Sequence, residues 1–148
     1  MDQPHILLVD DDLYVVESLK ASLEHLGYRV TPAFGFGQAK EKLRKRDKID
    51  LMILDYLLPD GSGTDLLQSL GNEPGLQKPP VILSSGILDP KAAVWEEIRN
   101  RLPIESRTLI HAYVSKPYTL DAMDLAVHEV LGGDYQPGKG APKRAVHE

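Results

Sequence analysis

Short, continuous apolar runs alternate along the chain with segments whose apolar residues recur at helical spacing. The runs occupy residues 6–9, 51–54, 81–83 and 109–114, and they are typical of strands that are buried on both faces. Three other segments each carry one apolar stripe, which predicts a helix packed on a sheet. The stripes are Val16, Leu19, Leu23 and Leu26; Phe36, Ala39 and Leu43; and Met123, Ala126, Val127, Val130 and Leu131.

One further segment, residues 29–34, alternates between polar and apolar positions and contains Pro32. Proline has no amide hydrogen to donate to a ladder, so we expect this strand at an edge of the sheet. Strand and helix alternating five times favours an α/β fold, with a doubly wound, five-stranded parallel sheet and helices on both faces. In such a sheet, ligands bind beyond the carboxyl ends of the strands.

Local signals mark the ends of two helices and of the domain. Gly27 follows the first stripe as a helix stop, and the Thr119 hydroxyl can cap the last helix. The periodic pattern stops after Leu131, and residues 133–148 are rich in glycine, proline and basic residues. We predict one domain over residues 1–132, followed by a disordered tail that is either a docking segment or an untethered end.

Composition narrows the class of protein. A chain of 148 residues suffices for one domain and leaves no room for a separate output module, so we expect a stand-alone domain. The net charge is −5, with 22 acidic and 17 basic residues, which argues against direct binding to nucleic acid. Cysteine is absent, and no apolar run is long enough to span a membrane. These features predict a soluble, cytoplasmic protein.

Carboxylates follow two of the predicted strands. Asp10, Asp11 and Asp12 come directly after the first run, and Asp55 follows the run at 51–54, so both groups lie at one edge of a parallel sheet. At about 5 Å and an effective dielectric near 20, each like-charged pair costs roughly 3 kcal/mol. A hard divalent cation such as Mg²⁺ would neutralise them. Scattered histidines and the absence of cysteine argue against zinc.

A simpler interpretation is that residues 10–12 only cap the first helix and favour its positive N-terminus. Other polar groups at the same edge support a chemical role. The run at 81–83 is followed by Ser84 and Ser85, and the last run is followed by Lys116. A carboxylate nucleophile, a metal, a hydroxyl and an ammonium together suit phosphoryl transfer, in which positioning and charge neutralisation dominate.

With these residues the sequence resembles the receiver domain of bacterial response regulators, from Ile6 to about Leu131. Four motifs in order carry the resemblance: ILLVDDD at 6–12, LMILDYLLPDGSG at 51–63, PVILSSG at 80–86 and YVSKPY at 113–118. The resemblance implies a flavodoxin-like sheet with strand order 2-1-3-4-5 and a role in two-component signalling.

The resemblance further implies that Asp55 accepts a phosphoryl group from a sensor histidine kinase or a histidine phosphotransfer protein. Asp10 and Asp11 would hold Mg²⁺, Asp11 directly, and Asp55 and the backbone carbonyl of Leu57 would complete the protein ligands. Such a phosphoprotein is not an enzyme in the usual sense, because it catalyses only its own phosphotransfer and dephosphorylation. Its downstream partner is unknown, and homodimer formation is left open.

The same resemblance assigns the switch residues. By register within the motif, Ser85 rather than Ser84 would supply the switch hydroxyl. Lys116 would pair with a phosphoryl oxygen, and a cis bond before Pro117 would aim it. Tyr113 matches the aromatic residue whose inward swing reports phosphorylation, although an ordinary strand aromatic also fits this position. Switching would be a population shift between two arrangements of Ser85 and Tyr113.

The stretch between Ser85 and Lys116 is longer than the resembled family usually has, by roughly two to three helical turns. The extra length predicts an extended or displaced fourth helix within residues 87–108, a face through which receivers usually signal. Partner geometry therefore cannot be taken from the family. The residues that form the stripe of this predicted helix are Val94, Ile98 and Leu102.

Two other functions fit part of the pattern. Haloacid-dehalogenase-like phosphatases also use an aspartate, Mg²⁺, a hydroxyl and a lysine, and Asp10 and Asp12 have the required spacing. However, Leu13 and Tyr14 stand where that family has a glycine and a Thr or Val, and Asp55 would have no role. The other alternative is a pseudo-receiver, a binding module that keeps the fold but does not signal by phosphate.

Overall fold

A computed structural model of the protein describes residues 3–58, 60–85 and 100–132. Its main sheet has five parallel strands in the order β2-β1-β3-β6-β7, and a separate antiparallel hairpin pairs β4 with β5. The predicted order 2-1-3-4-5 is confirmed, because β6 and β7 are the fourth and fifth strands of the main sheet. The strands are β1 His5–Val9, β2 Arg29–Ala33, β3 Leu51–Asp55, β4 Leu57–Leu58, β5 Gly61–Ser62, β6 Val81–Ser85 and β7 Ile110–Ser115.

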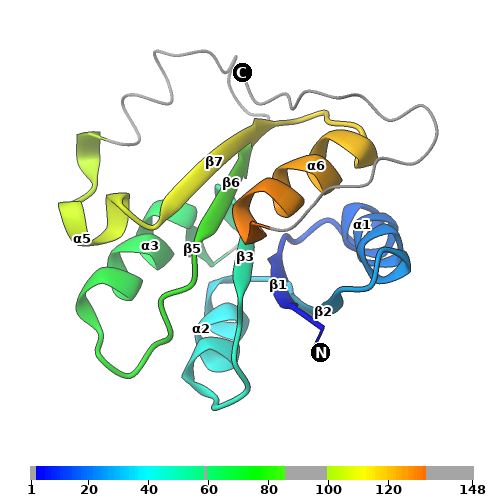
Figure 1. Ribbon diagram of the computed structural model, residues 1–148. Helices are drawn as coiled ribbons and strands as arrows, with labels where there is room; N and C mark the ends of the chain where they lie inside the picture. The colour runs from blue at the N-terminus through cyan, green and yellow to red at the C-terminus, as the bar shows by residue number, and fades with distance from the viewer. Residues whose placement is uncertain (1–2, 59, 86–99, 133–148) are drawn as a thin grey trace.

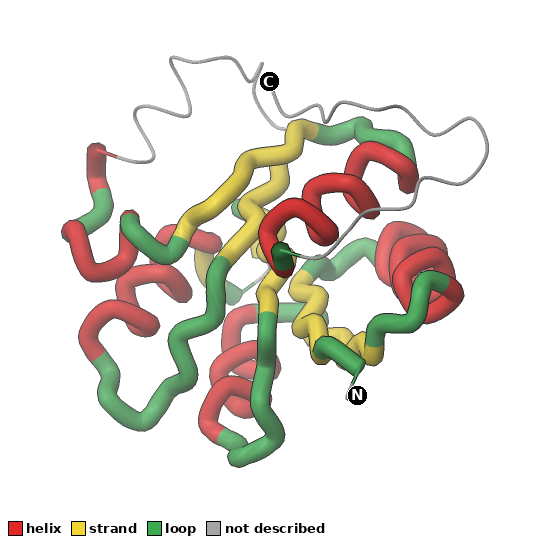
Figure 2. The backbone as a smooth tube through the Cα atoms, viewed as in Figure 1, coloured by secondary structure: helices red, strands yellow, loops and turns green. Residues whose placement is uncertain are grey.

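Helices cover both faces of the sheet. Figure 1 shows α1 and α6 on one side and α2, α3 and α5 on the other, and Figure 2 shows the strands as the layer between them. This is the predicted doubly wound arrangement. The helices are α1 Leu13–His25, α2 Phe36–Arg44, α3 Gly63–Asn72, α5 Ile104–Arg107 and α6 Leu120–Leu131.

The inner strands are mostly apolar because they bury both faces, and their polar residues stand at the strand ends. Leu7 and Val9 of β1 pack in the core beneath α2 and α3, whereas Ile6 and Leu8 pack beneath α1 and α6. This alternation follows from the two-residue period of a strand. Burying a side chain of this size contributes about 1.5 to 3 kcal/mol, so the two cores hold the carboxyl ends of the strands at fixed positions.

The edge strand and both predicted caps are confirmed. Strand β2, which contains Pro32, pairs only with β1. Gly27 follows α1 with φ of +102°, a left-handed conformation that suits glycine. The Thr119 hydroxyl accepts a hydrogen bond from the Ala122 amide at 3.0 Å and caps α6.

One expectation about the helices needs correction, and one helix is absent from the sequence predictions. Leu26, predicted on the buried stripe of the first helix, is 48% exposed, because α1 ends at His25 and Leu26 is its C-cap. Helix α3 was not singled out by its own stripe, although Leu66, Leu67 and Leu70 are buried at helical spacing.

The predicted fourth helix lies mostly outside the described residues, which resume at Asn100. Asn100 and Arg101 are helical, and Leu102 is buried in the core. Pro103 is then the N-cap of a separate four-residue helix, α5. The extension is therefore broken at its C-terminal end rather than continuous. The stripe residues Val94 and Ile98 lie outside the described residues. The tail at 133–148 also lies outside them, so its predicted disorder is not tested.

Among the described residues, no helix combines the length and the apolar character needed to cross a membrane.

Candidate phosphoacceptor site

Three carboxylates meet beyond β1 and at the end of β3. One oxygen atom from each of Asp10, Asp11 and Asp55 lies within 4.8 Å of the other two. Asp10 and Asp55 are 3% and 7% exposed, whereas Asp11 is exposed to solvent. Because β1 and β3 are paired in parallel, both deliver their following residues to the same edge of the sheet. The sequence prediction that these carboxylates lie together is confirmed by their positions.

Lys116 reaches the same cluster from the end of β7. Its Nζ donates a hydrogen bond to Asp10 Oδ2 at 2.8 Å and lies 3.6 Å from Asp55 Oδ1. Burial disfavours the charged ammonium, but the bond to Asp10 and the charge of Asp55 outweigh it and raise the pKa of Lys116. The Lys116–Pro117 peptide bond is cis, as the resemblance implies. Lys116 thus partly neutralises the acidic cluster.

The electrostatic balance at Asp55 makes its ionised form less favourable than that of an ordinary aspartate. Burial raises the pKa of Asp55 to about 6, the charge of Asp10 adds to this rise, and Lys116 opposes it. Additional positive charge nearby would stabilise the ionised form of Asp55, because the Lys116 ammonium does not fully offset the burial and the repulsion from Asp10.

The capping interpretation of the acidic triplet is also partly right. Asp12 is the N-cap of α1, and its Oδ1 accepts hydrogen bonds from the amides of Tyr14 at 3.0 Å and Val15 at 3.4 Å. Asp10 instead accepts from the Asp12 amide at 2.9 Å and from Lys116. Within the triplet, Asp12 therefore caps α1, whereas Asp10 and Asp11 belong to the carboxylate cluster.

The loop after Asp55 folds back as the hairpin of β4 and β5. The Gly63 amide donates to the Tyr56 carbonyl at 2.6 Å, next to the facing pair Leu57 and Ser62. In an antiparallel ladder this makes Leu57–Ser62 a non-hydrogen-bonded pair. The backbone carbonyl of Leu57 then accepts no ladder hydrogen bond from Ser62, and it remains a candidate cation ligand. The Leu57 side chain lies outside what the structure describes.

The donor set suits a hard divalent cation. Carboxylate and carbonyl oxygens are the ligands that Mg²⁺ takes in proteins, usually one or two carboxylates together with water and phosphate oxygens. Among the described residues, Asp10 and Asp55 are buried with one ammonium, that of Lys116, as counter-charge, which leaves these carboxylates in excess. The residues present therefore fit a bound Mg²⁺.

The predicted switch residues lie on adjacent strands. Ser85 ends β6 and is paired in register with Ser115 of β7, two residues beyond Tyr113. The Ser85 side chain lies outside what the structure describes. Tyr113 is half-buried against the core beneath α3, and burial raises its pKa. Within the described residues the buried Ser84 hydroxyl has no hydrogen-bond partner, so the preference for Ser85 remains a prediction.

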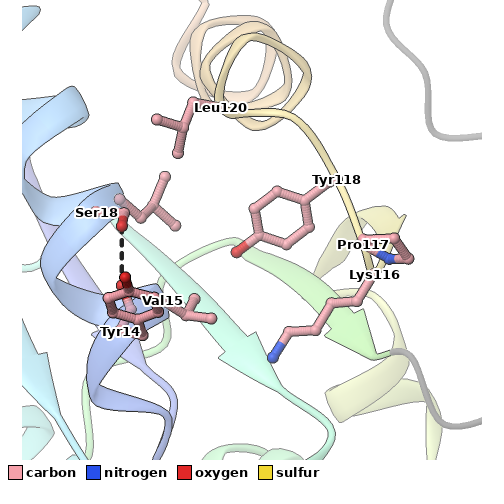
Figure 3. A pocket seen from close by; sticks show the side chains of 8 residues that line it. Tyr14, Val15, Ser18, Lys116, Pro117, Tyr118 and Leu120 are labelled. Carbon is pink, nitrogen blue, oxygen red and sulfur yellow. Dashed lines mark hydrogen bonds between the residues drawn. The ribbon is translucent and has the colours of Figure 1, made fainter.

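A largely apolar cavity of about 470 Å³ adjoins the cluster and shares Lys116 with it. Figure 3 shows Tyr14 and Val15 of α1 facing Tyr118 and Leu120 across this cavity, with the Lys116 side chain at its lower end. Tyr14 is 80% exposed. Burial and the charges of Asp10 and Asp55 raise the pKa of Tyr118. The acidic site therefore borders an apolar cavity that is partly open to solvent.

Sequence reasoning gave no role to Asp60 or Tyr118, although both lie inside the quoted motifs. Asp60 accepts hydrogen bonds from the amides of Phe36 and Gly37, and Tyr118 lines the cavity. The sequence shows Asp60 only as an acid beside Gly61, in the loop after the third strand. No neighbouring residue indicates that its partner is α2.

The comparisons with known proteins agree with this fold. The chain belongs to the response regulator receiver domain family, whose model matches residues 6–128. It is thus a receiver domain of the kind used in two-component signalling, which leaves the haloacid-dehalogenase-like alternative unsupported.

Curated relatives include longer proteins. The chain is 29% identical over 132 residues to the transcriptional regulatory protein CrdR of Helicobacter pylori, covering 89% of this chain and 57% of that protein. It is 32% identical over 127 residues to the probable transcriptional regulatory protein TcrX of Mycobacterium tuberculosis, covering 85% and 49%. The chain therefore spans about half the length of these relatives.

Solved structures show the same fold. The signal receiver domain of an HD domain-containing protein from Pseudomonas fluorescens Pf-5 is 28% identical, with a TM-score of 0.71 over 88% of this chain and 95% of that one. A CheY-like receiver domain protein from Methanospirillum hungatei JF-1 is 26% identical, with a TM-score of 0.70 over 88% and 94%.

Proposed function

We propose that Asp55 accepts a phosphoryl group from a phosphohistidine on a sensor histidine kinase or a histidine phosphotransfer protein. The observation that supports this most directly is the approach of Lys116 Nζ to within 3.6 Å of Asp55 Oδ1, beside the carboxylates of Asp10 and Asp11. A carboxylate oxygen of Asp55 attacks the phosphorus, the phosphorus–nitrogen bond to histidine breaks, and an aspartyl phosphate forms.

The surrounding residues divide the work of neutralising charge. Asp10, Asp11, Asp55 and the Leu57 carbonyl would hold Mg²⁺, which when bound supplies positive charge to the phosphoryl oxygens. Lys116, already beside Asp55, turns to a phosphoryl oxygen as the carboxylate charge moves onto the new group. Because Asp55 is held almost fully buried at a strand end, little motion is needed to present its oxygen in line.

The cavity beside Lys116 suits the approach of a phosphodonor. Tyr14 and Leu120 are exposed apolar side chains that line it. An apolar surface next to the phosphoacceptor can be covered by a docking protein. The signal would leave through a population shift of Ser85 and Tyr113 toward the arrangement that bonds the phosphoryl group. The downstream partner is a protein whose identity the site does not define.

Incubation with acetyl phosphate and Mg²⁺ tests the proposal. We expect the wild type to gain one phosphoryl group by intact mass, and Asp55→Asn to gain none because an amide is not a nucleophile here. Asp47→Asn, which changes an exposed carboxylate paired with Arg29, serves as the matched control and should behave as the wild type. A wild type that stays unmodified would favour a pseudo-receiver.

A further inference from the structure

The tip of the hairpin after Asp55 is tied to the N-terminus of α2. Asp60 lies between β4 and β5, and its Oδ1 accepts a hydrogen bond from the Phe36 amide at 2.6 Å while its Oδ2 accepts one from the Gly37 amide at 3.0 Å. The first amides of a helix have no partner within the helix, and a carboxylate also interacts favourably with the positive helix end. Asp60 therefore caps a helix that is distant in sequence.

Gly35 makes room for this contact. It is the N-cap position of α2, and it provides no side-chain cap of its own. A Cβ atom at residue 35 would stand 2.7 Å from Asp60 Oδ1, closer than such atoms approach in proteins. Its φ of −173° is ordinary extended backbone, so the need for glycine comes from the approach of Asp60 and not from backbone conformation.

The other end of the hairpin is anchored on the main sheet. The Tyr56 amide donates to the Ser84 carbonyl at 2.8 Å, and the Gly63 amide donates to the Tyr56 carbonyl at 2.6 Å. Leu57 lies between this base and the Asp60 tip. Two strands of two residues each form a ladder too short to be stable alone, so both anchors are needed to hold the Leu57 backbone beside the acidic cluster.

We propose that Asp60 is a positioning residue of the phosphoacceptor site, and that its bridge to α2 holds the Leu57 carbonyl where it can complete the divalent cation site. This inference rests on the proposed function, because it takes Leu57 as a ligand. Asp60 itself touches neither the cation nor the phosphoryl group. It acts through the hairpin.

The test compares variants that break the bridge from either side. Asp60→Ala removes the carboxylate. Gly35→Ala keeps the aspartate in the sequence, but its added methyl group pushes the carboxylate away from the α2 amides. Asp60→Asn keeps one acceptor oxygen for one of the two amides and should show an intermediate effect. The matched controls are Asp47→Ala, another exposed acid, and Gly75→Ala, whose added Cβ would meet no atom within 4 Å.

The readout is the Mg²⁺ dependence of phosphorylation by acetyl phosphate, together with direct calorimetric titration of Mg²⁺ into the unphosphorylated protein. We expect Asp60→Ala and Gly35→Ala each to weaken Mg²⁺ binding about 10-fold, as is usual when a residue supporting a metal ligand is lost. The phosphorylation rate at saturating Mg²⁺ should stay close to that of the wild type. A general loss of stability would instead lower the rate at every Mg²⁺ concentration.

The two proposals fail in different ways. If the wild type is phosphorylated and both variants bind Mg²⁺ as it does, the role of Asp60 is wrong while the phosphoacceptor proposal stands. If the wild type is not phosphorylated, the phosphoacceptor proposal fails, and the calorimetric titration still decides whether Asp60 supports cation binding. Should Asp60→Ala fail to fold, Gly35→Ala and Asp60→Asn carry the same comparison.

Discussion

Asp124 shows how burial changes the behaviour of one carboxyl group away from the phosphoacceptor site. It lies on α6 where this helix packs against α1, and it is 5% exposed. Ser22 Oγ of α1 donates to its carboxylate, at 3.1 Å from one oxygen and 3.4 Å from the other. Burial raises the pKa of Asp124 to about 6, the Ser22 bond opposes this rise, and Asp121 adds to it.

This shift makes stability depend on pH. Because the folded pKa lies above the ordinary value of 3.8, the folded protein binds the proton more tightly than the unfolded chain. The free energy of unfolding therefore falls as the pH rises from about 4 to about 6, and the loss is complete above that window.

Asp124→Asn should remove the cost of burying the ionised group while keeping a partner for Ser22. We expect the variant to be more stable than the wild type by about 1 to 2 kcal/mol above pH 6, a value discounted for solvent screening. The difference should shrink through the window and vanish near pH 4. Urea denaturation of both proteins across this range measures it. Glu129→Gln, at an exposed position of α6, should show no such pH-dependent gain.

At the scale of elements, the short helix α5 packs closely against α3. Ser106 of α5 is fully buried, and its hydroxyl donates to the Leu67 carbonyl of α3 at 2.6 Å. A Cβ at Gly71 would overlap Ser106 Oγ. A glycine inside a helix is ordinarily unfavourable, so its presence here is explained by the room that it leaves for α5.

Gly71→Ala is therefore expected to destabilise the protein by about 1 to 2 kcal/mol, although alanine is the better helix former. The reason is that the added methyl group displaces Ser106 from the Leu67 carbonyl. Chemical denaturation measures the change, and Gly75→Ala is the control because its position is open.

A double-mutant cycle with Ser106→Ala separates the clash from other effects of the substitution. The smaller residue at 106 should recover part of the stability lost in Gly71→Ala, giving a favourable coupling energy. If Gly71→Ala is as stable as the wild type, the α3–α5 contact does not constrain this position.

At the scale of the whole molecule, a cation bound at the acidic cluster would couple its binding to folding. Asp10, Asp11 and Asp55 come together only in the folded chain, so a ligand that needs all of them binds the folded state alone. Mg²⁺ at 100 times its dissociation constant would then add about 2.7 kcal/mol to the free energy of unfolding.

Thermal unfolding of the wild type should therefore shift to higher temperature as MgCl₂ is added, beyond the shift caused by NaCl at equal ionic strength. In Asp11→Asn the shift should be much smaller, because this exposed residue contributes a carboxylate to the cluster. An equal response of both proteins to MgCl₂ would show that the cation acts on the surface generally and not at the cluster.

Much of the fold was predictable because its signals are local. Apolar runs identified the inner strands, Pro32 identified the edge strand, and Thr119 identified a cap. The alternation of strands and helices then left few arrangements, because parallel strands need crossovers of one hand. The boundary error at Leu26 arose because helical periodicity continues past the residue at which the chain stops being helical.

The sequence by itself determined that four carboxylates and a lysine follow strand ends, and parallel pairing of the strands places them at one edge of the sheet. Only the tertiary structure decided how they pair: Lys116 donates to Asp10, 106 positions away, and lies farther from Asp55. It also decided that Asp60 caps α2 and that α5 packs on Gly71. These contacts join residues distant in sequence, so they depend on how the packed elements bring side chains together, which no local period encodes.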